Sequence, residues 1–287
     1  MNKAHRVNVT HLERRAERAA PGFEAAGFVH ATTLHGLLER LEPMPIDARV
    51  VVDLGCGTGL AARALEKRFR NAIVIGADRT QCPLQEARAK RRWLSRISYL
   101  RAYPEALPLP DHSVDVVFSN LALAAMDDPA PVAREVARVL KEGGLFILAT
   151  LGPDSLGVLE RAWQAVDDEP HVQRFMDMHD LGDLLVHAGL RDPVLDVDRL
   201  RLEYASSAAL FRDLTATGAR NSLAERRPTL TGPRRFGRMT AELESHRKGG
   251  ALAVELELVY GHCWGRGQAR RGGEVRIAPG AIGVRRR

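Results

Sequence analysis

The residues with the clearest chemical content lie close together near position 55. Residues 51–59 read VVDLGCGTG, so three glycines directly follow a β-branched run. Glycine lets the backbone approach a ligand that any Cβ would push away. Dinucleotide-binding loops have the spacing G-x-G-x-x-G, whereas here Gly59 comes one residue earlier and position 60 is leucine. We interpret this segment as a ligand-binding bend of another kind; a plain tight turn, with Asp53 capping a helix, is the alternative.

The acid upstream of the glycines indicates which ligand the bend would bind. Asp53 precedes Gly55 by two residues, and its carboxylate would repel the pyrophosphate that helix amino termini otherwise attract. A cationic ammonium or sulfonium group would be attracted, and S-adenosylmethionine carries both. Asp78 ends the next β-branched run, where a carboxylate can accept hydrogen bonds from two ribose hydroxyls. The sequence therefore predicts S-adenosylmethionine as cofactor.

Two further segments are candidates for the cofactor site. Glu105 and Ala106 follow the third expected strand, where we expect a loop that borders the adenine, and Asn120 ends the fourth, facing the methyl-transfer region. Ordinary polar turns are the alternative for both.

The three cysteines are far apart, so we expect neither a disulfide framework nor a metal site. Cys56, with no neighbouring histidine, is expected to be a small packing residue.

These residues need a scaffold that brings strand ends together, and the pattern of the chain predicts one. Buried strands are expected at 50–54, 72–76, 97–100, 114–118 and 145–149, with helices at 58–69, 85–94 and 131–140 between them. Parallel neighbours need crossover helices, so this rhythm predicts a doubly wound α/β sheet. Ligands of such sheets bind beyond the carboxyl ends of the strands.

The rest of the chain is expected to be more helical. Helices are predicted at 32–41, 155–166, 181–188, 207–217 and 238–247, and strands at 194–204 and 252–260. We divide the chain into a leading helical segment (1–30), a domain (31–264) with a helical insertion at about 205–250, and a basic tail (265–287).

Composition narrows the class of protein. The net charge of +6 comes from the tail, which holds seven arginines and one acid after position 264, so the remainder is balanced. With 5% aromatic residues there are few side chains on which nucleic-acid bases could stack, and we expect no nucleic-acid partner.

No apolar run approaches the roughly 20 residues of a membrane span, and the polar first 18 residues do not resemble a secretory signal. We therefore expect a cytoplasmic protein without a membrane partner; its oligomeric state is not predicted.

Several blocks resemble a known family. Together with residues 51–59, the blocks EALPLP (105–110), SVDVVFSNLAL (113–123) and EVARVLKEGG (135–144) resemble class I S-adenosylmethionine-dependent methyltransferases. The blocks AWQAVD (162–167), HVQRF (171–175), LTATGARN (214–221) and GHCW (261–264) narrow the resemblance to the malonyl-acyl-carrier-protein O-methyltransferases of biotin synthesis, the BioC family. It covers roughly residues 19–264.

The resemblance implies a fold, a site and a reaction. The fold is a seven-stranded, mostly parallel sheet with an antiparallel last strand and a helical insertion. Asp53, Gly55, Gly57 and Gly59 would line the methionine part of the cofactor, and Asp78 would bind its ribose. The reaction is O-methylation of the free carboxylate of malonyl-acyl carrier protein. The family often has an acid for the adenine amino group where this chain has a tyrosine, at position 103.

The substrate site is less specified by sequence. A malonyl carboxylate is ionised at neutral pH and needs no general base, so we assign no catalytic residue. A cation must orient it: Arg220 and His262 are our substrate-binding candidates, with Arg201 and Arg247 as further possibilities. Arginines between 226 and 235 would suit an acidic carrier protein, although a solvated loop explains them equally well.

Two other functions stay open. One is a methyltransferase-fold enzyme that modifies a different substrate, such as a protein side chain. Residues 177–190 resemble an assembly factor of this fold thought to hydroxylate a protein arginine. The other is a non-catalytic module that retains the cofactor pocket.

Overall fold

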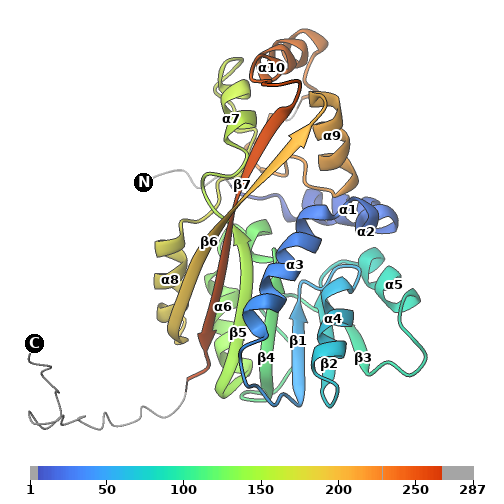
Figure 1. Cartoon of the computed structure of the whole chain (residues 1–287), viewed down its shortest axis with the longest axis vertical. Helices are drawn as coiled ribbons and strands as arrows, with labels where there is room; N and C mark the ends of the chain where they lie inside the picture. Colours follow the sequence, from blue (N-terminus) through green and yellow to red (C-terminus); the bar gives the residue numbers. More distant parts are fainter. Residues whose placement is uncertain (1–5, 228, 267–287) are drawn as a thin grey trace, which may run out of the picture.

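The protein is organised around one seven-stranded sheet. The structure, a computed structural model, describes residues 6–227 and 229–266. The strand order is β3-β2-β1-β4-β5-β7-β6 (Figure 1). The strands are β1 (Val50–Leu54), β2 (Ile73–Asp78), β3 (Ile97–Arg101), β4 (Val114–Asn120), β5 (Leu140–Leu151), β6 (Arg191–Tyr204) and β7 (Leu252–Trp264). Neighbours are parallel except at β7, which is antiparallel to both β5 and β6. The predicted fold class is confirmed.

Burial explains why these segments form strands. In β1, Val51 to Leu54 are all buried, as expected of a central parallel strand covered on both faces. β6, at the sheet edge, instead alternates between partly buried and exposed residues, as a half-covered strand does. The central position of β1 places Asp53 between Gly76 of β2 and Phe118 of β4.

Helices cover both faces of the sheet. On one face α3 (Phe28–Leu41) and α4 (Leu60–Arg68) contribute buried leucines and alanines to one apolar cluster. On the other face α6 (Ala130–Val139) and α8 (Met178–His187) contribute to a second cluster. α5 (Gln81–Ala89) packs beside β3. Because β1, β2 and β4 are parallel, their carboxyl ends lie at the same edge of the sheet.

A second layer of helices lies beyond that edge. β6 and β7 extend past the sheet, and α7 (Gly157–Gln164), α9 (Ser207–Ala216) and α10 (Pro233–Ser245) pack around their far end (Figure 1). α9 and α10 lie between β6 and β7 in sequence, as the predicted helical insertion requires. The amino-terminal elements α1 (Val9–Ala19), η1 (Ala20–Gly22) and α2 (Phe23–Ala26) lie between this layer and the sheet (Figure 1).

Some predicted boundaries were wrong. The helix expected at 85–94 runs from Gln81 to Ala89, because the proline at position 83 sits in its first turn, where a missing N–H costs nothing. Trp93 and Leu94, which the pattern placed inside that helix, are exposed in the following loop. The division into segment, domain and tail stays a prediction, and the tail lies outside the described residues after Arg266. Among the described residues, no helix has the length and apolar character that crossing a membrane requires.

Two helical glycines give a matched test of the packing. A Cβ on Gly36 of α3 would lie 2.6 Å from Tyr260 Oη and 2.8 Å from its Cζ, whereas one on Gly237 of α10 would meet nothing within 4 Å. Tyr260 is 1% exposed and has no room to shift. We expect G36A to lower the free energy of unfolding by about 1–2 kcal/mol, and G237A to raise it by up to about 1 kcal/mol. Urea denaturation measures both, and changes of the same sign would contradict the packing described.

Candidate functional site

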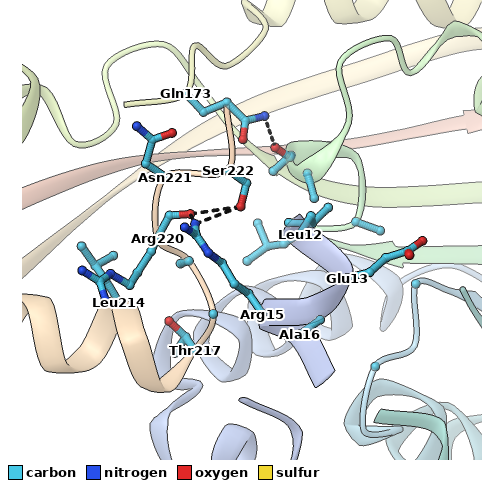
Figure 2. A pocket seen from close by; sticks show the side chains of 18 of the residues that line it. Leu12, Glu13, Arg15, Ala16, Gln173, Leu214, Thr217, Arg220, Asn221 and Ser222 are labelled. Carbon is cyan, nitrogen blue, oxygen red and sulfur yellow. Dashed lines mark hydrogen bonds between the residues drawn. The ribbon is translucent and has the colours of Figure 1, made fainter. Parts of the chain in front are cut away.

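A cavity of about 770 Å³ opens at the carboxyl ends of β1, β2 and β4. Its lining comes from two sources. One part belongs to the sheet edge and includes Asp53 and Asp78; the other comes from α1, α7, α9 and the loops around them. Figure 2 shows the lining residues of α1 and of the loop after α9. The cavity therefore joins the residues that the sequence singled out with a second group that is distant from them in the chain.

The glycine bend forms the floor of the first part. Gly55, Gly57 and Gly59 all have positive φ angles, of 73°, 51° and 77°, which favour glycine. A Cβ on Gly55 would overlap that of Ala122, whereas one on Gly57 would meet no atom within 4 Å. Gly55 and Gly57 line the cavity, while Gly59 lies behind it against Tyr99. The bend therefore presents bare backbone to a ligand.

Asp53 is the unusual group of this site. It is 1% exposed, lines the cavity, and its Oδ2 atom has no hydrogen-bond partner among the described residues. Burial raises the pKa of Asp53 to about 7; nearby Asp78 acts in the same direction, while the Ala62 N–H and Arg63 oppose it. A buried carboxylate without a partner is costly. The site is therefore suited to a ligand that brings a cation or a donor.

Asp78 is held in a fixed orientation beside it. Its Oδ2 accepts a hydrogen bond from the Gly57 N–H at 2.9 Å, and its Oδ1 accepts two from Thr80, from the N–H at 2.8 Å and from Oγ1 at 2.5 Å. A carboxylate has about four acceptor positions, so Oδ2 retains capacity for a further donor. Asp78 also lines the cavity, as a group that binds a ribose must.

Asn120 lines the cavity, but its amide is engaged with α3. Its Nδ2 donates to the His30 carbonyl at 2.9 Å, and its Oδ1 accepts from Thr33 Oγ1 at 2.7 Å. The end of β4 is thereby tied to the first turns of α3. Asn120 positions this wall of the cavity in addition to contributing to it.

That link brings in His30, which the sequence analysis missed. His30 lines the cavity and packs edge-on against Phe23 at 4.8 Å between ring centroids. Its Nδ1 is buried without a partner among the described residues, and burial lowers the pKa of His30 to about 4. The imidazole is therefore neutral at physiological pH. His30 precedes the helix expected at 32–41, and only the earlier start of α3 at Phe28 places it in the first turn of a helix beside the cavity.

The structure places Glu105 and Ala106 outside the cavity. Glu105 pairs with Arg79 at 3.5 Å, and the Ala106 N–H donates to the Tyr103 carbonyl at 3.1 Å in a tight turn. Tyr103 is 57% exposed. Ala102 and Pro104 line the cavity instead. The loop does border the cavity as expected, but different residues face it because the turn points the next side chains outward.

Of the four candidates for substrate orientation, only Arg220 lines the cavity. Arg201 pairs with Glu203 at 3.2 Å and Arg247 with Glu244 at 3.5 Å. The structure does not bring His262 to the site: it lies within β7 between β5 and β6, with its ring edge-on to Trp264. Burial lowers its pKa. The family resemblance gave no information on which face of β7 this residue occupies.

The second part of the cavity has an aromatic wall. The Trp163 and His171 rings are stacked at 3.6 Å with an angle of 7°, and His171 Nε2 contacts Asp167 Oδ1 at 2.7 Å. Phe211 and Phe236 continue this wall. Trp163 and His171 belong to segments that carry the family resemblance, whereas Phe211 and Phe236 do not, and the sequence pattern predicted no role for any of the four.

The described residues offer neither a cluster of metal ligands nor a reactive thiol in this cavity. No group of three or more histidine, cysteine or acidic residues within the described ranges could hold a metal ion. Cys56 is buried in the bend, and burial raises the pKa of its thiol well above the ordinary value. The thiol therefore stays protonated, in agreement with the expected packing role.

The raised pKa of Asp53 makes stability depend on pH. Because the folded state holds this proton more tightly than the unfolded state does (ordinary pKa 3.8), its contribution is present at low pH and is lost as pH rises towards 7. We expect Asp53→Asn, which cannot ionise, to be more stable relative to wild type at about pH 8 than at about pH 5. Thermal unfolding of both proteins measures the difference, and a difference independent of pH would contradict this assignment.

Comparison with known proteins supports one family. The family model described as "Methyltransferase domain" matches residues 52–148. The malonyl-[acyl-carrier protein] O-methyltransferase of Halorhodospira halophila is 39% identical over 282 residues, which cover 96% of each chain. The enzyme of that name from Nitrosospira multiformis is 36% identical, with 92% of this chain and 91% of the relative covered.

Solved structures agree on the fold. The YcgJ protein of Bacillus subtilis matches with a TM-score of 0.60 at 19% identity, covering 82% of this chain and 99% of that one. A SAM-dependent methyltransferase of Thermotoga maritima matches with a TM-score of 0.54 at 21% identity, covering 89% of this chain and all of that one. These likenesses concern architecture alone. Because these relatives are 36–39% identical over nearly the whole chain, the chain belongs to the malonyl-[acyl-carrier protein] O-methyltransferase family, within the methyltransferases of this fold.

Proposed function

We propose that this protein transfers the methyl group of S-adenosylmethionine to the free carboxylate of a malonyl group on acyl carrier protein, forming a methyl ester in biotin synthesis. One observation carries the proposal within this family: a single cavity has Asp53, a buried carboxyl group whose Oδ2 has no partner among the described residues, in one part, and Arg220 with an apolar aromatic wall in the other. The first part suits a cationic nucleoside. The second suits an anionic acyl group on a long, flexible arm.

The residues present fit the cofactor. Asp53 offers a buried negative charge to a cation, and the bare backbone of Gly55 and Gly57 permits close approach. Asp78 Oδ2, with one donor in the protein, retains acceptor capacity for a ribose hydroxyl. When bound, S-adenosylmethionine supplies a methyl group on a positively charged sulfur that a nucleophile can attack. His30, uncharged because its pKa is about 4, adds no positive charge that would oppose the binding of such a ligand.

The protein has little proton chemistry to perform. A malonyl carboxylate is already ionised at neutral pH, so the reaction needs no general base. The residues that line the cavity instead align the cofactor and the malonyl group. Such alignment is the main source of acceleration in a transfer between two bound molecules. Asn120 serves this alignment because it fixes α3 and His30 against the end of β4.

The carrier protein would approach from the side of the second helical layer. Trp163, Phe211 and Phe236 offer an apolar wall to the thioester and its pantetheine arm. Arg226 and Arg227 also line this part of the cavity, where they would attract an acidic carrier protein.

Transfer of label tests the function directly. With methyl-labelled S-adenosylmethionine, we expect label in malonyl-acyl carrier protein as a base-labile ester, and none in acetyl-acyl carrier protein, which lacks the acceptor carboxylate. The gene should also restore growth of a strain that requires biotin through loss of this step. Absence of label with a wild-type protein that binds the cofactor would refute the proposed acceptor.

The two acids of the cofactor site should have different effects. S-adenosylhomocysteine differs from the cofactor by lacking the methyl group and the sulfonium charge. We expect Asp53→Asn to reduce the preference for S-adenosylmethionine over S-adenosylhomocysteine by roughly tenfold, because a charge–charge attraction of about 1 kcal/mol or more is lost. Asp78→Asn, as matched control, should weaken both ligands alike, since both carry the ribose. Calorimetric titration measures the four affinities, and an unchanged preference in the first variant would exclude Asp53 as the group that attracts the sulfonium.

A further inference from the structure

Arg15 is an arginine of the cavity that neither the sequence reasoning nor the family resemblance assigned. It lies on α1, is partly buried, and lines the cavity. Its Nη1 donates to the Arg220 carbonyl and to Ser222 Oγ, the latter at 3.0 Å (Figure 2). These two bonds tie the side chain to the loop after α9. The guanidinium is therefore held in place before any ligand binds.

The rest of this guanidinium is available to a ligand. Among the described residues, only Nη1 of Arg15 makes hydrogen bonds within the protein. The Nε and Nη2 atoms form the edge of an arginine that can donate two parallel hydrogen bonds to one carboxylate. An arginine fixed through one terminal nitrogen, with this edge unused, is preorganised for a planar anion.

The charges around Arg15 also call for an anion. Within residues 6–227 and 229–266, no acidic side chain forms an ion pair with it, although Glu13 also lines the cavity. Burial and the neighbouring cations Arg226, Arg220 and Arg18 all lower the pKa of Arg15. Arginine stays charged despite such shifts. Its positive charge therefore has no ion-pair partner in the part of the chain that the structure describes.

We infer that Arg15 binds the free carboxylate of the acyl substrate through its Nε–Nη2 edge, and that this contact selects malonyl over uncharged acyl groups. The inference rests on the proposed function and adds to it the residue that recognises the acceptor. The cavity then has opposite charges at its two ends, with Asp53 for the cationic nucleoside and Arg15 for the anionic acyl group. Methylation removes the negative charge of the substrate, so the same contact favours release of the ester.

The test compares two ligands that differ in one carboxylate. The affinities of malonyl- and acetyl-acyl carrier protein are measured for the wild-type protein with S-adenosylhomocysteine bound, and for R15Q, R15K and R14Q. Arg14 is the matched control, because it is the adjacent residue of α1, is exposed, and does not line the cavity. We expect R15Q to weaken malonyl binding by about 10- to 100-fold, the loss of a charged hydrogen-bonded pair. R15K should fall between wild type and R15Q, since lysine keeps the charge but loses the fork.

Acetyl binding and cofactor affinity should stay at wild-type values in R15Q, which also verifies that the variant is folded. R14Q should match wild type with both carrier proteins. Equal losses for malonyl and acetyl carrier protein would overturn the inference and assign Arg15 to the phosphate of the pantetheine arm. Unchanged malonyl affinity in R15Q would overturn it as well. Failure of the proposed function is distinct, because the wild-type protein would then show no methyl transfer to malonyl carrier protein.

Discussion

A carboxyl group kept out of water at the centre of the sheet governs the arrangement of this molecule. Asp53 is placed there by β1, whose neighbours on both sides are buried strands, and its Oδ2 has no partner among the described residues. Desolvation of such a group is unfavourable unless a cation or donor compensates it. The glycine bend, the fixed orientation of Asp78 and the open cavity together allow a ligand that carries the compensating group to reach Asp53.

The cavity is built from parts of the chain that are far apart in sequence. The sheet edge supplies the acidic end of the cavity, and α1, α7 and α9 with the loop that follows supply the arginines and the aromatic wall. Val7 pairs with Leu223, and Arg15 bonds to the same loop, so the amino-terminal segment and the insertion hold one another. Two charges of opposite sign within one cavity orient two partners of opposite charge toward each other.

Much of the fold followed from local patterns. The run VVVDL is β-branched or apolar at every position except Asp53, and LFILA is apolar throughout, as expected of strands that are covered on both faces. Their alternation with helices allows few topologies. Boundaries were less certain: α5 begins at Gln81, since a proline is compatible both with a loop and with a first helical turn. The antiparallel β7 entered only through the family resemblance, because strand direction is set by pairing partners rather than by composition.

For the site, the sequence by itself determined the groups whose role depends on backbone conformation. Gly55, Gly57 and Asp53 lie where a strand becomes a helix, so their spacing alone places them at the ligand edge. Only the tertiary structure decided which other side chains reach that edge. It turned Glu105 outward into an ion pair and brought His30 and Arg15 inward. The reason is that a side chain's direction depends on the packing of its element against distant ones, and sequence spacing carries no record of that packing.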